Sequence, residues 1–155
     1  MLFEMNGWQR FQWYNAMTVM IDTNVVLDVL EVRKPHFDSS CAALCKLLSC
    51  GAVRLFSASA ATDVFYILTK YIYSTDETRL YLRRISLFVS FASVLGEDVQ
   101  DALAGEAGDF EDELVAVIAQ RNGARVILTR DLKGFATSHV PAVIPDDFLR
   151  GYNGS

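Results

Sequence analysis

The stretch IDTNVVLD, residues 21–28, decides the fold. It places one carboxylate, Asp22, between the apolar runs 19–21 and 25–27. A single charge among apolar residues is costly unless it is paired or holds a metal ion. We therefore expect the rest of the chain to supply the partner of Asp22.

The length and composition indicate one folded domain. The chain has 155 residues, 52% of them hydrophobic, and a mean hydropathy of +0.22, which argues against disorder. No apolar run reaches the roughly 18 to 20 residues of a membrane span, and no signal peptide is visible. We expect a bacterial-type cytoplasmic setting without a membrane.

The net charge and the cysteines argue against two classes of protein, broad nucleic-acid binders and zinc proteins. A net charge of −5 disfavours a broad, non-specific nucleic-acid binder, which needs a basic surface. It is compatible with an enzyme whose negative charge is concentrated in a metal site. The three cysteines are few and closely spaced, and the two histidines are far apart, so free buried thiols are favoured over a zinc site.

Outward from residues 21–28, apolar strands alternate with amphipathic helices. The expected strands are 18–22, 53–57, 89–95, 124–129 and 142–144. The expected helices are 37–49, 60–72 with Ser59 as N-cap, 75–87 with a Ser74–Glu77 capping box, 97–107 and 109–123. This alternation predicts a parallel sheet covered on both faces. Its functional site should lie beyond the carboxyl ends of the strands, where strand order reverses.

The domain is expected to span residues 17–155. Residues 1–16 are rich in aromatic side chains and show no clean periodicity. The sequence leaves open whether they are tag residues, a mis-assigned start or an added element that packs on the domain or on a partner.

Acidic residues stand at positions that this topology would bring together. Asp22 and Asp131 each follow an apolar strand, the first and the fourth. Asp63 is expected in the first turn of the helix after the second strand. The first turn of helix 109–123 carries Asp109, Asp112 and Glu113, which we expect on one face. Such a cluster would need cations, and oxygen ligands favour Mg²⁺ or Mn²⁺.

Each acid also has an ordinary structural explanation. An Asp in a first helical turn favours the helix dipole by ~0.3 to 1 kcal/mol, which would account for Asp63 and Asp109. Asp131 is also a turn former before Gly134. Asp28 is expected to be a solvated helix residue or to support a ligand without touching metal. Asp22 has the weakest ordinary explanation, because its flanks are strongly apolar.

Four motifs, in this order, resemble the PIN domain family. They are IDTNVVLD, the helix acid Asp63, DFEDELVAVIA and ILTRDLKGF, within residues 18–148, and the first and last are the most specific. The resemblance implies an α/β three-layer sandwich, with a central parallel sheet of four to five strands flanked by helices. It also implies a metal-dependent ribonuclease, of the VapC-like type that serves as the toxin of a type II toxin–antitoxin pair.

The resemblance carries roles to eight positions. Catalytic and metal-binding roles, for one or two Mg²⁺ or Mn²⁺ ions, fall on Asp22, Asp63, Asp112 and Asp131. Supporting or substrate roles fall on Asn24, Thr129, Asp109 and Arg130, with Asp109 the competing choice for the third acid. Asp63 is one methylene shorter than the glutamate usual in the family. The resemblance therefore implies that Asp63 contacts the metal through a water molecule or not at all. For Arg130, ordinary exposed charge is the alternative to contact with the RNA backbone.

Proteins of other classes also place an aspartate after the first strand. An aspartyl phosphotransferase of the haloacid-dehalogenase type needs a second aspartate where this chain has Asn24. A receiver domain needs a late lysine that ILTRD does not supply. A stronger alternative is a catalytically weak or inactive PIN-like module that binds protein or RNA.

The helix around residues 62–73, TDVFYILTKYIY, carries more aromatic side chains than one core can take. Some would face an antitoxin or a second copy in a homodimer, unless all are buried within the monomer.

Overall fold

The computed structural model describes residues 17–105 and 109–151. The interpretation of residues 1–16 lies outside this range, so the expected boundary at residue 17 stays a prediction. Five strands are described: β1 Thr18–Ile21, β2 Val53–Ser57, β3 Ser90–Ala92, β4 Val126–Leu128 and β5 Ala142–Val143. They form one parallel sheet in the order β3-β2-β1-β4-β5.

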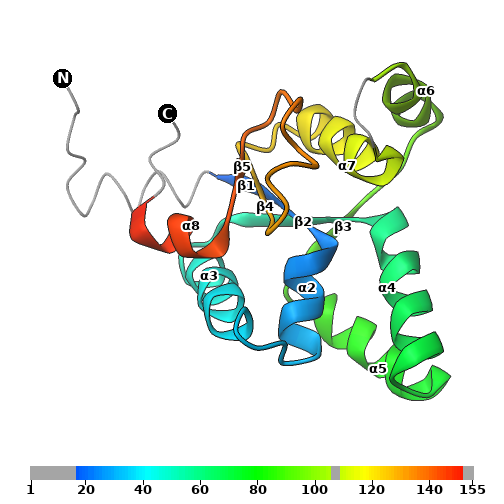
Figure 1. The fold of residues 1–155 in the computed structure, drawn as a ribbon, viewed down its shortest axis with the longest axis vertical. Helices are drawn as coiled ribbons and strands as arrows, with labels where there is room; N and C mark the ends of the chain where they lie inside the picture. The colour runs from blue at the N-terminus through cyan, green and yellow to red at the C-terminus, as the bar shows by residue number, and fades with distance from the viewer. Residues whose placement is uncertain (1–16, 106–108, 152–155) are drawn as a thin grey trace.

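Helices cover both faces of this sheet (Figure 1). Their bounds are α2 Thr23–Leu30, α3 Phe37–Ser49, α4 Ala58–Tyr71, α5 Thr75–Ile85, α6 Gly96–Ala104, α7 Phe110–Arg121 and α8 Pro145–Gly151. α6 and α7 lie on one side, and α2, α3, α4, α5 and α8 lie on the other. The expected three-layer α/β sandwich, with a parallel sheet of four to five strands, is confirmed.

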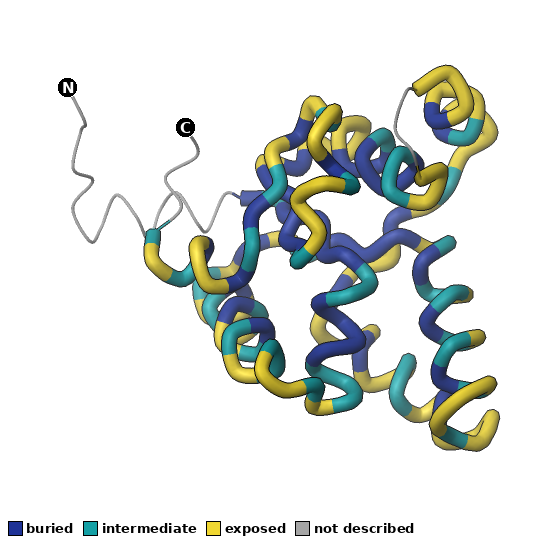
Figure 2. Tube along the Cα trace, in the orientation of Figure 1, coloured by how far each residue is buried: buried dark blue, intermediate teal, exposed yellow. Residues whose placement is uncertain are grey.

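The sheet separates two apolar cores, and β1 contributes to both. Val19 and Ile21 pack into the core beneath α2, α3, α4 and α8, whereas Met20 packs into the core beneath α6 and α7. This alternation follows from the two-residue period of a strand. Figure 2 shows the buried chain running through the middle layer.

The sequence misplaced several element boundaries. α4 begins at Ala58 with Ser57 as N-cap, not Ser59, because the chain turns from β2 directly into the helix. Asp63 is therefore in the second helical turn rather than the first. β3 is shorter than expected, because it is an edge strand that pairs with β2 alone. α8 was not expected, and α5 and α6 end two to three residues before their predicted ends, at Ile85 and Ala104.

Two further expectations from the sequence were the lack of a membrane span and the burial of free cysteines. Along the described ranges, no helix has the length and apolar character needed to cross a bilayer. The three cysteines are free, but they are half-buried or exposed on α3 and just after it, so the expectation of burial was wrong. The apolar side of α3 is formed instead by Ala43 and Leu47, which are buried.

Candidate active site

The candidate site lies at the carboxyl ends of β1 and β4. These two strands are neighbours, and the strand order reverses between them. Asp22 follows β1 and is the N-cap of α2, and its main-chain N–H donates to the Leu128 carbonyl at 3.0 Å. The Thr129–Asp131 segment follows β4. Ligand sites of open parallel sheets are found at this kind of position.

Asp22 is buried and is held by three hydrogen-bond donors. Its carboxylate accepts from the Thr23 main-chain N–H at 2.7 Å, from Asn24 Nδ2 at 2.6 Å and from Thr129 Oγ1 at 2.6 Å. Burial raises the pKa of Asp22, and the hydrogen bonds from Thr129 and Thr23 act against this rise. The net rise means that these donors only partly compensate for the loss of water.

Asn24 ties α2 to the segment after β4. Its Nδ2 donates to Asp22 and also to Thr129 Oγ1, the latter at 3.1 Å, while its Oδ1 accepts from the Arg130 main-chain N–H at 3.0 Å. The expected supporting positions, Asn24 and Thr129, therefore both contact Asp22. The Asp131 N–H completes the link by donating to Thr129 Oγ1 at 2.9 Å.

Asp131 forms a turn and also borders the site. Its Oδ1 accepts from the main-chain N–H groups of Lys133 and Gly134, both at 3.1 Å. A Cβ atom added at Gly134 would lie 3.2 Å from Asp131 Oδ2 and 2.8 Å from the Asp112 Cγ, and it would collide with Asp112 Oδ2. The carboxylates of Asp112 and Asp131 therefore both pack against Gly134.

The acids repel one another. The pKa of Asp112 is raised to about 6 by burial and by the negative charges of Asp22, Asp109 and Asp131. The pKa of Glu111 is also raised to about 6, by burial and by four neighbouring aspartates, among which Asp63 is the strongest. Sequence reasoning missed Glu111. Its place next to Asp112 in an acidic first helical turn was the available signal.

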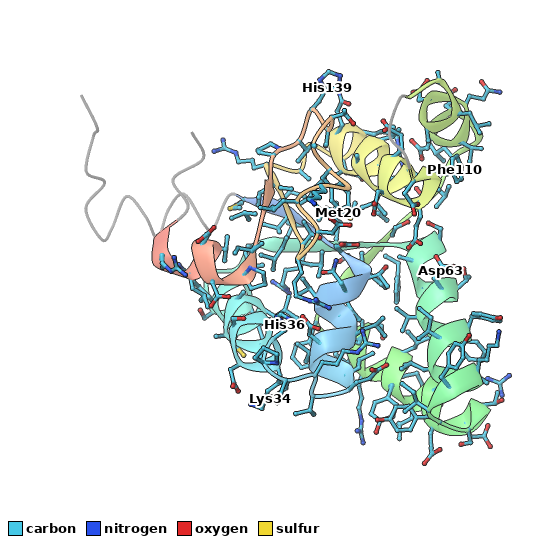
Figure 3. The ribbon with its side chains drawn as sticks, viewed as in Figure 1. Met20, Lys34, His36, Asp63, Phe110 and His139 are labelled. Atoms are coloured by element: carbon cyan, nitrogen blue, oxygen red, sulfur yellow. The ribbon has the colours of Figure 1, made fainter. Side chains whose placement is uncertain are left out.

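Asp63 lies at the margin of this cluster. It is on the part of α4 nearest to the start of α7, where Figure 3 labels Phe110. Its charge acts on Glu111, whereas the pKa values of Asp22 and Asp112 are raised by burial first and then by acids other than Asp63. The structure thus brings Asp22, Asp112 and Asp131 together and places Asp63 next to Glu111.

The three acids expected on one face of α7 have different surroundings. Asp109 precedes the helix as its N-cap, with an extended backbone, and its Oδ1 accepts from the Glu111 N–H at 2.8 Å. Helical periodicity therefore does not apply to it. Glu113 packs against Gly105 instead. The expectation of a shared face was wrong for Glu113. Asp109 lies near Asp112, whose pKa it raises, and Asp112 packs with Asp131 against Gly134.

Arg130 turns toward α2. Its Nε donates to Asp28 Oδ2 at 2.8 Å, and the side chain of Asp28 is fully buried. The expectation of a solvated Asp28 was therefore wrong, because a charged partner and α3 enclose it. The Arg130 charge still acts on Asp22, whose pKa it lowers.

The cluster suits a divalent cation in charge and in donor type. Carboxylate oxygens are the ligands that Mg²⁺ and Mn²⁺ prefer, and a cation would relieve the repulsion among these acids. In the part of the chain that the structure describes, however, no three Asp, Glu, His or Cys side chains converge closely enough to hold a metal ion. Asp22 and Asp131 both accept hydrogen bonds, so a cation would bind carboxylates that these donors already orient.

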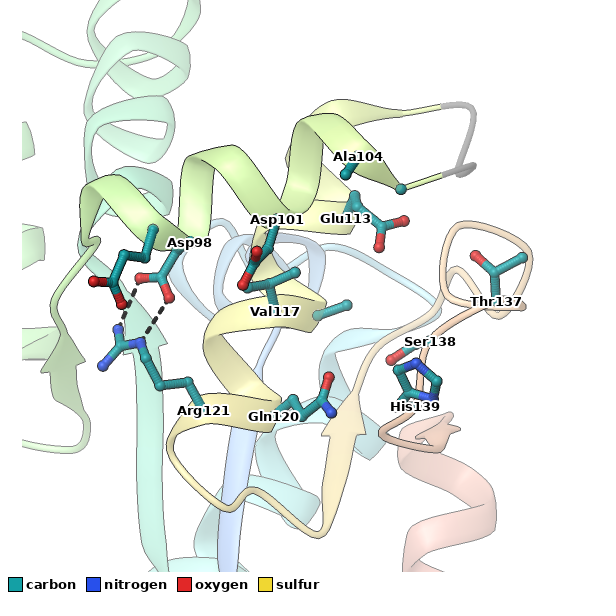
Figure 4. A pocket seen from close by; sticks show the side chains of 13 residues that line it. Asp98, Asp101, Ala104, Glu113, Val117, Gln120, Arg121, Thr137, Ser138 and His139 are labelled. Carbon is teal, nitrogen blue, oxygen red and sulfur yellow. Dashed lines mark hydrogen bonds and ion pairs between the residues drawn. The ribbon is translucent and has the colours of Figure 1, made fainter.

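A cavity of about 530 Å³ lies elsewhere, between α6, α7 and residues 137–139 (Figure 4). Its lining includes Glu113 and the Asp98–Arg121 ion pair, and none of the eight positions predicted for the site. The acid cluster therefore lies at the edge of the sheet, outside this cavity.

The fold and the position of its acids define a known class of domain. The PIN domain profile matches residues 18–133, more than half of the chain, so the chain belongs to the PIN domain family. Among curated proteins, it is 25% identical over 146 residues to Ribonuclease VapC1 of Aquifex aeolicus strain VF5, covering 90% of this chain and 98% of that protein.

Solved structures share the fold. VapBC2 from Rickettsia felis, crystallised with a DNA fragment from its promoter, matches with a TM-score of 0.64 and 17% identity, over 83% of this chain and 98% of that one. VapC20 from Mycobacterium tuberculosis, described as a sarcin-ricin loop cleaving toxin, matches with a TM-score of 0.61 and 12% identity, over 77% and 94% of the chains.

Proposed function

We propose that this PIN domain is a ribonuclease, the toxin of a toxin–antitoxin pair, and that it hydrolyses RNA phosphodiester bonds with one or two Mg²⁺ or Mn²⁺ ions. The observation that carries the proposal is the meeting of Asp22, Asp112 and Asp131 at the β1–β4 edge, from three separate elements. Similarity to a VapC ribonuclease over nine-tenths of the chain supports it.

Asp22, Asp112 and Asp131 would hold the cation. When bound, a divalent cation offsets the charge of the scissile phosphate and makes a bound water more acidic. Thr129 and Asn24 fix the carboxylate of Asp22 through their hydrogen bonds. Such supporting contacts keep a ligand in one orientation, so that it does not need to be ordered during the reaction.

Asp63 and Glu111 would act at the border of the site. Asp63 is one methylene shorter than the family's usual glutamate, and its charge acts on Glu111. We propose that any contact between Asp63 and the cation is mediated by water. The guanidinium of Arg130 is partly exposed at another border, where it would meet an RNA phosphate.

A catalytically weak PIN module is the second candidate. The observation that favours it is the lack of three converging metal ligands among the residues that the structure describes. If the chain were only a binding module, wild type and the Asp22→Asn variant would not differ in Mn²⁺ binding. An active site would lose cation binding and RNA cleavage together on that substitution.

A protein antitoxin is the proposed partner. Several solved structures with this fold are toxin–antitoxin complexes, including VapBC2 of Rickettsia felis. On α4, Tyr66 and Tyr71 are 58% and 67% exposed, which confirms that the aromatic side chains of this helix do not all enter the core. We propose this aromatic surface for the antitoxin, with homodimerisation through it as the alternative.

Cleavage of end-labelled RNAs of mixed sequence tests the proposal. Wild-type protein and the Asp22→Asn variant would be compared in Mg²⁺, in Mn²⁺ and in EDTA. We expect cutting by the wild type with either metal, and none in EDTA or with the variant. Absence of both cutting and Mn²⁺ binding in the wild type would overturn the ribonuclease proposal in favour of the binding module.

A further inference from the structure

Arg130 connects the candidate site to a buried carboxylate that the proposed reaction does not use. Arg130 Nε and Ser40 Oγ both donate to Asp28 Oδ2, at 2.8 Å and 2.9 Å. Asp28 lies on α2 and Ser40 on α3, so this oxygen joins two helices to the segment after β4. Asp28 Oδ1 is buried and has no hydrogen-bond partner among the described residues.

The position of Arg130 brings a positive charge close to the acids. Its main-chain N–H is fixed by Asn24, which also donates to Asp22, and the next residue is Asp131. A guanidinium released from Asp28 would have the carboxylates of Asp22 and Asp131 nearby. Arginine forms strong, often bidentate hydrogen bonds with carboxylates, so it would occupy oxygens that a cation needs.

We propose that Asp28 is a positioning residue that holds the Arg130 guanidinium at the side of the acid cluster and so keeps the carboxylates free for a divalent cation. The inference rests on the proposed function, because it assigns Asp28 a part in preparing that site. It predicts competition: a cation and a released Arg130 cannot both use the same oxygens.

A purely structural role for Asp28 is the alternative. Removing one partner of a buried ion pair leaves an uncompensated charge and destabilises the fold, wherever the pair lies. The chain offers a matched control in Asp98 and Arg121, joined at 2.7 Å and 2.9 Å between α6 and α7 (Figure 4). The aspartates are 0% and 2% exposed in the two pairs and the arginines 30% and 31%.

Mn²⁺ binding by titration calorimetry tests the inference with four variants: Asp28→Asn, Arg130→Gln, the double variant Asp28→Asn/Arg130→Gln, and Asp98→Asn. We expect Asp28→Asn to bind Mn²⁺ about tenfold more weakly than wild type, as one competing charged contact would predict. Arg130→Gln and the double variant should both bind at least as tightly as wild type. Asp98→Asn should lose stability in urea with unchanged Mn²⁺ affinity.

The affinity of Arg130→Gln is the decisive result. If the pair served the fold alone, this variant would leave Asp28 as an unpaired buried charge and would weaken Mn²⁺ binding as Asp28→Asn does, whereas removal of a competing guanidinium predicts the opposite. Wild-type affinity in Asp28→Asn would overturn the inference, as would a double variant as weak as Asp28→Asn. Failure of the wild type to bind Mn²⁺ would overturn the proposed function itself, and is thus a distinguishable outcome.

A measurement on the wild type keeps the inference testable if Asp28→Asn does not fold. The Nε–H resonance of Arg130 is identified in ¹⁵N-edited NMR spectra by its loss in Arg130→Gln. We expect it to exchange slowly with water and to keep its position when Mg²⁺ is added. Rapid exchange, or a large shift on adding Mg²⁺, would show that Asp28 does not hold the guanidinium and would overturn the inference.

Discussion

Neutral hydrogen-bond donors hold the carboxylate of Asp22 between its apolar flanks. A main-chain N–H, an amide and a hydroxyl hold its carboxylate, and the positive charge of Arg130 acts on it from the side. Hydrogen bonds of this kind make a buried carboxylate tolerable, but the raised pKa shows that burial still dominates. A divalent cation would stabilise the ionised form, which is why this residue is the centre of the proposed site.

Gly134 provides a test of the packing around Asp112. Gly134→Ala places a methyl group against the Asp112 carboxylate and should displace it. We expect roughly 10- to 100-fold weaker Mn²⁺ binding, the range found when groups that orient metal ligands are lost. Titration calorimetry measures the change. Gly96→Ala is the control, since a Cβ there meets nothing within 4 Å, and equal affinities in the two variants would refute the packing argument.

Asp109 and Asp112 compete for the role of third acid, and their geometry separates them. Asp109→Asn keeps an N-cap oxygen for α7, because asparagine caps as well as aspartate, so RNA cleavage should change little. Asp112→Asn should lower the cleavage rate by at least about 100-fold, more than the loss of a supporting group does. Initial rates with one labelled RNA decide between them. The reverse order would make Asp109 the ligand.

At the scale of elements, local signals were predictable from the sequence and contacts between elements were not. The capping box of α5 depends on residues three apart, and it was placed correctly at Ser74 and Glu77. β1 and the segment after β4 were also found, because apolar runs ending in Asp are unusual. The burial of Asp28 was missed because it depends on Arg130, which is 102 residues away. Glu111 was missed because part of its acidic surroundings is distant in sequence: Asp63 comes from α4 and Asp22 follows β1.

The capping box allows a stability prediction that is independent of function. Ser74 Oγ accepts from the Glu77 N–H, and Glu77 Oε2 accepts from the Ser74 N–H at 2.9 Å. Ser74→Ala should lower the free energy of unfolding by ~1 kcal/mol, as other cap substitutions do. Urea denaturation measures this, with the exposed Thr75→Ala as a control expected to stay within about 0.5 kcal/mol of wild type. Equal midpoints for the two variants would mean that the box does not stabilise the folded state.

At the scale of the whole molecule, strand order creates the site. β1 lies between β2 and β4, so the chain crosses from one half of the sheet to the other beside Asp22. α7 covers one face and brings Asp112 to the same edge, while α4 on the other face brings Asp63 near Glu111. The acids thus come from both layers, and their repulsion is a property of the complete fold that no single segment contains.

This repulsion should be visible in the pH dependence of stability. The pKa values of Asp112 and Glu111 rise from 3.8 and 4.5 to about 6 in the folded protein. The folded state therefore keeps these protons to higher pH than the unfolded state does. Their contribution to stability is fully present below about pH 4 and is lost as the pH rises through about 6. Groups with lowered pKa values, such as Asp98 and Glu77, act in the opposite direction at lower pH.

A comparison with Asp112→Asn isolates the site from those other groups. In EDTA, we expect the stability of wild type relative to Asp112→Asn to fall as the pH rises from about 4.5 to about 7.5, measured by urea denaturation. Saturating Mg²⁺ should then stabilise the wild type near neutral pH, by roughly 2.7 kcal/mol at a hundred times its dissociation constant. The ion should have little effect on wild type near pH 4.5, where Asp112 is protonated, or on Asp112→Asn at either pH. If the two proteins have parallel stability profiles in EDTA, Asp112 does not carry the repulsion. If Mg²⁺ stabilises both proteins equally, the ion binds elsewhere.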